Sequence, residues 1–163
     1  LGANEENSHA GKIIMISSVS GKRAYPFTSP YTASKHALEG YSDSIRKELM
    51  LYGIDVVIIE PGPIKTPIWD KAPSIEENPF LGTDYEPALR KFYGQMVTKG
   101  KMEGLHVDKV GKLITKVIRI NNPRTRYVIT GRKWLDYILP GILPDRWLDR
   151  LFAKFLGIDK EKI

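Results

Sequence analysis

The sequence predicts an α/β fold built on a parallel sheet. An apolar, mostly β-branched run ends at Ile16, a second covers residues 54–60, and a long helical pattern lies between them. Neither run alternates apolar with polar residues, which is typical of parallel strands buried on both faces. A helix that joins two such strands makes a β-α-β unit with a right-handed crossover.

Turn-forming and capping residues mark where these elements begin and end. Pro30 suits the first turn of the helix, and Gly53 suits its C-terminal cap. The segment after residue 60 begins with proline and glycine, so it ends the second strand abruptly. The expected elements are a loop over residues 1–11, strands over 12–17, 54–60 and 126–130, and helices over 29–52, 106–121 and within 86–102.

Two segments lie outside this regular pattern. Residues 67–104 are interrupted by prolines, and we expect them either to cover a binding site as an apolar lid or to pack as a small subdomain on the core. The side chains concerned are Trp69, Phe80, Leu81, Phe92, Tyr93 and Met96. Residues 132–163 form an amphipathic tail, which could cover the substrate site or a partner subunit, or lie on a membrane surface.

Composition narrows the class of protein. The chain has 163 residues, no cysteine and a net charge of +6, which suits one domain with a real core and excludes disulfides and thiolate metal sites. The basic residues are scattered, so we expect a solvated surface and no nucleic-acid partner. No apolar run approaches the ~20 residues of a membrane span. We therefore expect a cytoplasmic protein, with membrane association left open. Because the chain begins with Leu1, we also expect a fragment.

Hydroxyl and cationic side chains gather around the first strand and the first helix. Ser17 and Ser18 directly follow the strand, and Tyr31 and Lys35 lie in the first turns of the helix. Residues four apart share one helix face, so the phenol and the ammonium can point into one site. Ligands of open α/β sheets bind at the carboxyl ends of strands, where Ser18 and Pro61 are both expected.

This arrangement suits acid–base chemistry. A phenol has a reference pKa of about 10, and a nearby ammonium such as Lys35 favours the phenolate of Tyr31 and lowers that pKa. General acid–base catalysis is most efficient when the pKa lies near the working pH. The Ser18 hydroxyl could then hold the reacting oxygen beside the phenol. None of the three histidines has ligand-like spacing, so we expect no metal site.

Three motifs together resemble the short-chain dehydrogenase/reductase family, in its compact single-domain branch. They are S-S-V-S-G from Ser17, Y-T-A-S-K from Tyr31, thirteen residues after Ser18, and I-I-E-P-G-P-I-K-T-P from Ile58 to Pro67. Beyond Pro67 only the order of the elements fits. The family's extended branch, which includes sugar-nucleotide epimerases, shares the serine and Y-x-x-x-K but usually lacks the P-G-x-I-x-T segment found here.

The resemblance implies hydride transfer between a nicotinamide cofactor and an alcohol or carbonyl carbon. Tyr31 would be the general acid in reduction and the base in oxidation. Lys35 would contact the nicotinamide ribose and lower the Tyr31 pKa, and Ser18 would hold the substrate oxygen. Ser17 and Ser20 also lie near the site, but the thirteen-residue spacing selects Ser18.

The third motif implies the cofactor contacts. Pro61 and Gly62 would let the backbone approach the nicotinamide. Ile64 would bind the carboxamide through backbone atoms, and Thr66 would bond the carboxamide or the pyrophosphate. The cofactor would be NAD or NADP, a choice these residues leave open.

The glycine-rich turn that binds pyrophosphate in dinucleotide sites does not occur in these 163 residues. The pattern matches only the family's second half. We therefore expect the C-terminal half of a doubly wound parallel-sheet, Rossmann-like domain in three αβα layers. The resemblance also implies that this half binds cofactor poorly, and is inactive, by itself.

Three further expectations concern partners. Small residues (Ala33, Ala37, Gly40 and Ser44), together with Tyr41, line part of the first helix. They suit close packing, either on the chain's own sheet or on a symmetry mate in a homodimer or homotetramer. The apolar lid and tail favour a lipophilic alcohol or ketone. The alternative to an enzyme is a truncated, non-catalytic dimerisation or binding module.

Overall fold

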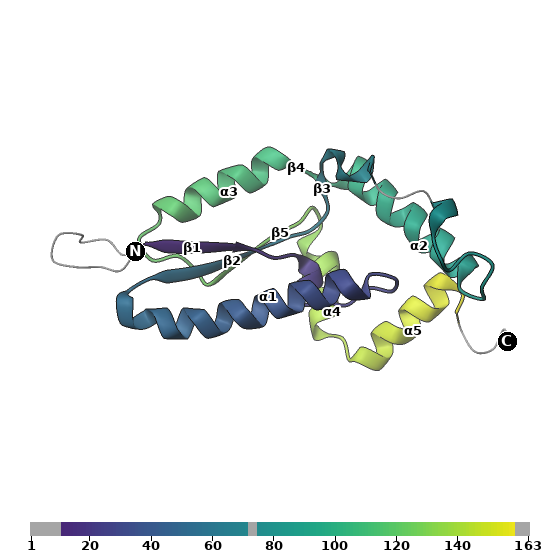
Figure 1. Cartoon of the computed structure of the whole chain (residues 1–163), viewed down its shortest axis with the longest axis horizontal. Coiled ribbons are helices and arrows are strands. Elements are labelled where there is room, and N and C mark those ends of the chain that lie inside the picture. Colours follow the sequence, from purple (N-terminus) through teal and green to yellow (C-terminus); the bar gives the residue numbers. More distant parts are fainter. Residues whose placement is uncertain (1–10, 72–74, 159–163) are drawn as a thin grey trace.

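The computed structural model describes residues 11–71 and 75–158, and in them the chain forms a three-layer α/β unit (Figure 1). The loop predicted over residues 1–11 lies outside this description except for its last residue. The strands are β1 (Lys12–Ile16), β2 (Asp55–Pro61), β3 (Ile64–Lys65), β4 (Leu105–His106) and β5 (Arg126–Ile129). The helices are α1 (Ser29–Glu48), α2 (Glu86–Thr98), α3 (Val107–Arg119), α4 (Leu139–Ile142) and α5 (Asp145–Leu156).

The main sheet has the order β1-β2-β5, and both pairings are parallel. Ile14 lies opposite Val57 in the first pairing, and Glu60 lies opposite Val128 in the second. Helix α1 covers one face of the sheet and α3 the other (Figure 1). This confirms the predicted α/β class with a parallel sheet.

Strand β2 is the centre of the core. Its residues from Val56 to Glu60 are all buried, as expected for a strand covered on both faces. Burial on both faces was also predicted for the first strand, and this prediction was wrong. The side chains of β1 are only half-buried, and Ile16 is 44% exposed. The reason is its place in the sheet, since β1 pairs only with β2 in the described part of the chain.

Helix α1 begins and ends as predicted. Pro30 occupies its first turn, and a short 3-10 turn over Leu49–Tyr52 extends it to Gly53, which adopts φ 64°. That left-handed conformation favours glycine. The small residues of α1 do not pack on the chain's own sheet, so this alternative was wrong. Gly40 has no atom within 4 Å of an added Cβ, and Tyr41 is 58% exposed.

The region after β2 holds a feature that the sequence did not predict. Strands β3 and β4 form a short parallel ladder in which Ile64 lies opposite Leu105. The helix expected within 86–102 is present as α2, continued by a wider π-helical turn over Lys99–Glu103. Because a Cβ on Gly100 would overlap the ring of Trp69, the glycine lets this turn pack against the indole.

The last part of the chain returns to the carboxyl ends of the strands. Helices α4 and α5 lie at the same end of the molecule as α2 (Figure 1), and α5 contacts α2. Helix α3 packs through Val117, which is fully buried. Its neighbour Ile118 is 57% exposed.

Candidate active site

The predicted site lies at the carboxyl ends of β1 and β2. Ser17 continues beside β2 after β1 ends, because its backbone N–H donates to the carbonyl of Ile59 at 2.8 Å. Its hydroxyl is buried, 2.6 Å from where a Cβ on Gly21 would stand. The Ser18 side chain caps the following 3-10 turn, since its Oγ accepts from the backbone N–H of Ser20 at 3.1 Å. The serine pair thus forms a tight corner at the end of β1.

The first turns of α1 bring Tyr31 and Lys35 to the same corner. Lys35 Nζ donates to the carbonyl oxygen of Ile16 at 3.0 Å and lies 5.8 Å from the centre of the Tyr31 ring. Tyr31 is 49% exposed, so its phenol is open to a ligand. Ile16 precedes Ser18 by two residues, so the structure brings Ser18, Tyr31 and Lys35 together at one strand end.

The Pro61-Gly62 pair lies beside β5. Pro61 is opposite Ile129, and the Gly62 N–H donates to the Ile129 carbonyl at 2.8 Å. A Cβ on Gly62 would stand 2.6 Å from Oγ1 of Thr130. The close approach that requires a glycine here is therefore to a neighbouring strand end. The resemblance had assigned that approach to the nicotinamide.

The other two predicted cofactor residues follow at β3. The carbonyl of Ile64 accepts from the indole Nε1 of Trp69 at 2.7 Å, so this oxygen is already engaged. Thr66 begins the short turn Pro67–Trp69, and its side chain makes no capping hydrogen bond. The half-buried Thr66 hydroxyl is thus a candidate donor at this end of the sheet.

A buried ion cluster beside the site was not predicted. Arg126, the first residue of β5, places Nε 3.2 Å from Oε2 of Glu39 and 3.3 Å from Oε1 of Glu60, and Nη2 2.6 Å from Oδ2 of Asp43. Lys22 adds a second cation, 3.4 Å from Glu39. Glu39 and Glu60 are 3% and 0% exposed. A carboxylate at the end of an otherwise apolar buried strand was the signal in the sequence.

These charges change the titration of the groups around them. Burial, and then the charge of Glu39, raises the pKa of Glu60. Burial and the nearby Glu60 carboxylate raise the pKa of Tyr137 to about 12. The hydrogen bond from Arg126 is the main reason why the pKa of Asp43 is lowered. The cluster therefore holds α1, β2 and β5 together through charges of opposite sign.

The aromatic residues of the 67–104 region pack partly on one another. Phe80, Tyr85 and Phe92 surround Phe27, which belongs to the loop between β1 and α1. The region therefore contacts the segment that leads directly to Tyr31. This contact fits both interpretations of the region, as a lid and as a packed subdomain.

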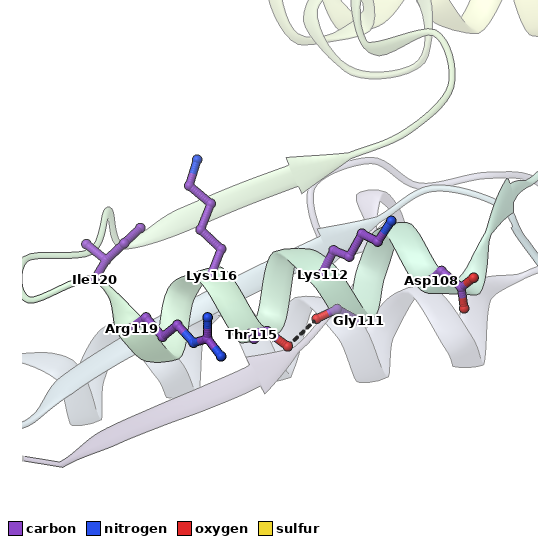
Figure 2. A pocket seen from close by; sticks show the side chains of 7 residues that line it. All are labelled: Asp108, Gly111, Lys112, Thr115, Lys116, Arg119 and Ile120. Atoms are coloured by element: carbon purple, nitrogen blue, oxygen red, sulfur yellow. Dashed lines mark hydrogen bonds between the residues drawn. The ribbon is translucent and has the colours of Figure 1, made fainter.

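Two of the hollows on the described surface differ in their lining. One hollow, of about 660 Å³, runs along α3 between Asp108 and Ile120, a segment far in sequence from the serine corner. Charged side chains project from this helix (Figure 2). The other, about 500 Å³, is mainly apolar and lies between residues 22–25 and the tail. We assign no catalytic role to the first hollow, because Ser18, Tyr31 and Lys35 are not among the residues that line it.

Within the described residues, no group of histidine and carboxylate side chains could hold a metal ion. His36, next to Lys35, turns its Nδ1 toward the carbonyl of Thr32 at 3.0 Å. In the same residues, no helix is long and apolar enough to cross a membrane.

Comparison with known proteins gives a consistent result. The family model for short chain dehydrogenases matches residues 3–77. The chain is 41% identical over 156 residues to an NADPH-dependent 3-dehydrocapnine reductase of Ornithobacterium rhinotracheale, covering 96% of this chain and 54% of that protein. It is 34% identical over 116 residues to a 3-ketodihydrosphingosine reductase of Bacteroides thetaiotaomicron, covering 71% of this chain and 42% of that one.

A solved structure supports the fold. A short-chain dehydrogenase from Streptomyces avermitilis superposes with a TM-score of 0.59 and 24% identity, covering 93% of this chain and 51% of its own. The chain spans about half the length of the curated relatives named above.

Proposed function

The chain belongs to the short-chain dehydrogenase/reductase family, and we propose that it is the C-terminal half of an NAD(P)-dependent oxidoreductase domain. The domain would transfer a hydride between the cofactor and an alcohol or ketone. The observation that supports this proposal is that Lys35, beside the ring of Tyr31, bonds the Ile16 carbonyl at the strand end that Ser18 follows. The glycine-rich half that binds pyrophosphate would complete the cofactor site.

Each of the three side chains has a role that its chemistry allows. In the reducing direction, Tyr31 would give its phenolic proton to the substrate oxygen while the carbonyl carbon accepts the hydride. In oxidation, the phenolate would take the hydroxyl proton back. Ser18 would donate a hydrogen bond to that oxygen, and its hydroxyl proton is free to do so while its Oγ accepts from the N–H of Ser20. An ammonium that already sits between the phenol and a strand end, as Lys35 does, stabilises negative charge on the phenol oxygen.

The residues present fit one part of a nicotinamide cofactor. Lys35 offers a cationic donor and Thr66 a hydroxyl without a capping bond, and both suit polar groups of a ribose and a carboxamide. Pro61 and Gly62 would form the wall beside them, and Ile64 would contribute its backbone. When bound, the cofactor supplies or accepts the hydride. The name of the 41% identical relative, an NADPH-dependent reductase, favours NADPH and reduction of a ketone.

The substrate would be lipophilic. The hollow between residues 22–25 and the tail has an apolar lining that includes Leu148 and Phe152, and the aromatic cluster around Phe27 adds further apolar surface. Apolar hollows with a few polar groups are typical of small-molecule sites. The named substrates of the two relatives are 3-dehydro and 3-keto compounds, which agrees with a ketone.

Two surfaces suit larger partners. The exposed face of α1, with Gly40 and Tyr41, suits a second copy of this chain in a homodimer or homotetramer. The tail exposes Trp147 and Leu151 on one side of α5, with Arg150 among the charged residues of that helix. Such a helix fits peripheral contact with an anionic membrane surface. The cytoplasm is the expected location, with the membrane contact made from that side.

The test uses the full-length protein and measures oxidation of NADPH or NADH with ketone substrates. Tyr31→Phe should lower kcat by about 10²–10⁴-fold, the usual contribution of a positioned acid–base group, while leaving cofactor binding intact. Tyr52→Phe is the matched control, because this phenol has a similar exposure at the far end of the same helix. Equal turnover by Tyr31→Phe and wild type would refute the acid–base role of Tyr31. No turnover by the wild-type protein itself would favour the alternative, a non-catalytic dimerisation or binding module.

A further inference from the structure

Phe27 adopts a backbone conformation that phenylalanine rarely takes. Its φ is 61°, and it is the only non-glycine residue with positive φ in the part of the chain that the structure describes. For a bulky side chain this region is sterically unfavourable. Such a residue persists when its surroundings over-determine its position, and these positions are concentrated at functional sites.

The ring of Phe27 contacts three other aromatic rings, and these contacts hold the residue in place. The centre of the ring lies 5.9 Å from that of Phe92 in α2, and 6.3 Å from those of Phe80 and Tyr85. Phe80 and Tyr85 are themselves 6.2 Å apart, so the four rings form one cluster. Distances and tilts of this kind are favourable for aromatic pairs. Three of the four rings belong to the 67–104 region.

The backbone on either side of Phe27 leads directly into the catalytic helix. Thr28 Oγ1 donates to the carbonyl of Tyr25 at 2.8 Å, and the Thr28 carbonyl accepts from the N–H of Thr32 at 2.8 Å. The Tyr25 ring packs edge-on against Phe152 of α5. Phe27 is therefore four residues before Tyr31, at the point where the 75–98 region and the start of α1 meet.

We propose that Phe27 is a positioning residue of the site: its ring joins the 75–98 region to the first turn of α1, so that the packing of this region and the placement of Tyr31 are coupled. The role rests on the proposed oxidoreductase function. Phe27 itself would touch neither the substrate oxygen nor the cofactor. Its left-handed backbone accompanies the placement of its ring in the aromatic cluster.

Two roles of Phe27 can be separated by substitution. Phe27→Gly satisfies the backbone but removes the ring, Phe27→Leu keeps an apolar side chain but removes the ring contacts, and Phe27→Tyr keeps both contacts and shape. If the ring is required, Phe27→Gly and Phe27→Leu should both weaken the coupling between the 75–98 region and the start of α1, and Phe27→Tyr should retain it. If only the backbone mattered, Phe27→Gly would behave like wild type or raise the Tm.

The decisive measurement does not depend on activity. Hydrogen exchange in the full-length protein should show amides 32–35 of α1 exchanging about two- to tenfold faster in Phe92→Leu, the factor that corresponds to the loss of one ring pair. Phe155→Leu is the matched control, because Phe155 also contacts α2, through Lys91 at 4.8 Å, but not Phe27. It should leave the exchange of these amides unchanged.

Kinetics provide the second measurement. Phe27→Leu should lower kcat for the ketone more than it raises KM for the cofactor, and Phe27→Tyr should restore kcat. Unchanged exchange at the start of α1 in both Phe92→Leu and Phe27→Leu would overturn the proposal. If exchange responds as expected but Tyr31→Phe stays active, the coupling stands and the proposed chemistry fails, so the two failures are distinguishable.

Discussion

Replacing Arg126 with methionine removes a guanidinium that lies between three carboxylates. Its nitrogen atoms are 2.6–3.3 Å from oxygens of Asp43, Glu39 and Glu60. Methionine keeps much of the apolar stem of the side chain, so the change acts mainly on charge. Lys22 stays 3.4 Å from Glu39 after the substitution. The carboxylate left with least compensation is therefore Glu60, which is fully buried.

The expected loss of stability follows from these distances and burial. Unit charges 3.2 Å apart attract each other by roughly 5 kcal/mol at an effective dielectric constant of about 20. Desolvation offsets part of this attraction in the intact cluster, but removing one partner leaves a buried charge uncompensated and destabilises by about 3–5 kcal/mol. At about 2–4 °C per kcal/mol for a domain of this size, the Tm of Arg126→Met should fall by roughly 6–20 °C.

The loss should also depend on pH, with a sign fixed by Glu60. Burial and Glu39 already raise its pKa above the usual 4.5. A carboxyl whose folded-state pKa is raised binds its proton more tightly when folded, so stability falls as the pH rises from the usual value through the raised one. Removing Arg126 raises that pKa further. The Tm deficit of the variant should therefore be largest at neutral pH and should shrink as the pH is lowered toward 4.5.

Thermal unfolding followed by circular dichroism between neutral and mildly acidic pH measures this effect. Arg132→Met is the control, because Arg132 pairs with Glu103 at 3.6 Å and both side chains are about half exposed. An exposed pair contributes only about 0–1 kcal/mol. Adding Glu60→Gln to Arg126→Met should recover part of the lost Tm. Equal losses in Arg126→Met and Arg132→Met, independent of pH, would refute the reasoning.

Three further predictions test other parts of the structure. Gly62→Ala should cost about 1–3 kcal/mol by overpacking against Thr130, and an unchanged urea midpoint would contradict that contact. Gly40→Leu meets nothing within 4 Å, so the fold should persist, while light scattering should show a smaller assembly; an unchanged mass would exclude this face of α1 as the subunit interface. Replacing Trp147 and Leu151 by serine should weaken sedimentation with anionic vesicles several-fold, and binding equal to wild type would rule out α5 as the membrane contact.

Local patterns predicted most of the fold. The apolar run of β2, the proline at the start of α1 and Gly53 at its end each depend on nearby residues, and each element is present as expected. Lys35 bonds the Ile16 carbonyl and lies 5.8 Å from the centre of the Tyr31 ring. Misplaced features depended on neighbours distant in sequence. Ile16 is exposed because of the position of its strand in the sheet, and Gly62 is required by Thr130, which lies 68 positions later in the chain.

The ion cluster and the predicted catalytic pair belong to one stripe of α1. Tyr31, Lys35, Glu39 and Asp43 follow one another at four-residue intervals, so they lie along one side of the helix. The first two face the open strand end, and the last two are held by Arg126 from β5. Because a helix is rigid over three turns, we infer that the ion pairs of Glu39 and Asp43 with Arg126 also fix the position of Tyr31 relative to the sheet. From periodicity alone, such acidic positions would be predicted to lie on a solvated face of the helix. In the structure they pair with Arg126 of the sheet, and we infer that this pairing helps to position the phenol of Tyr31.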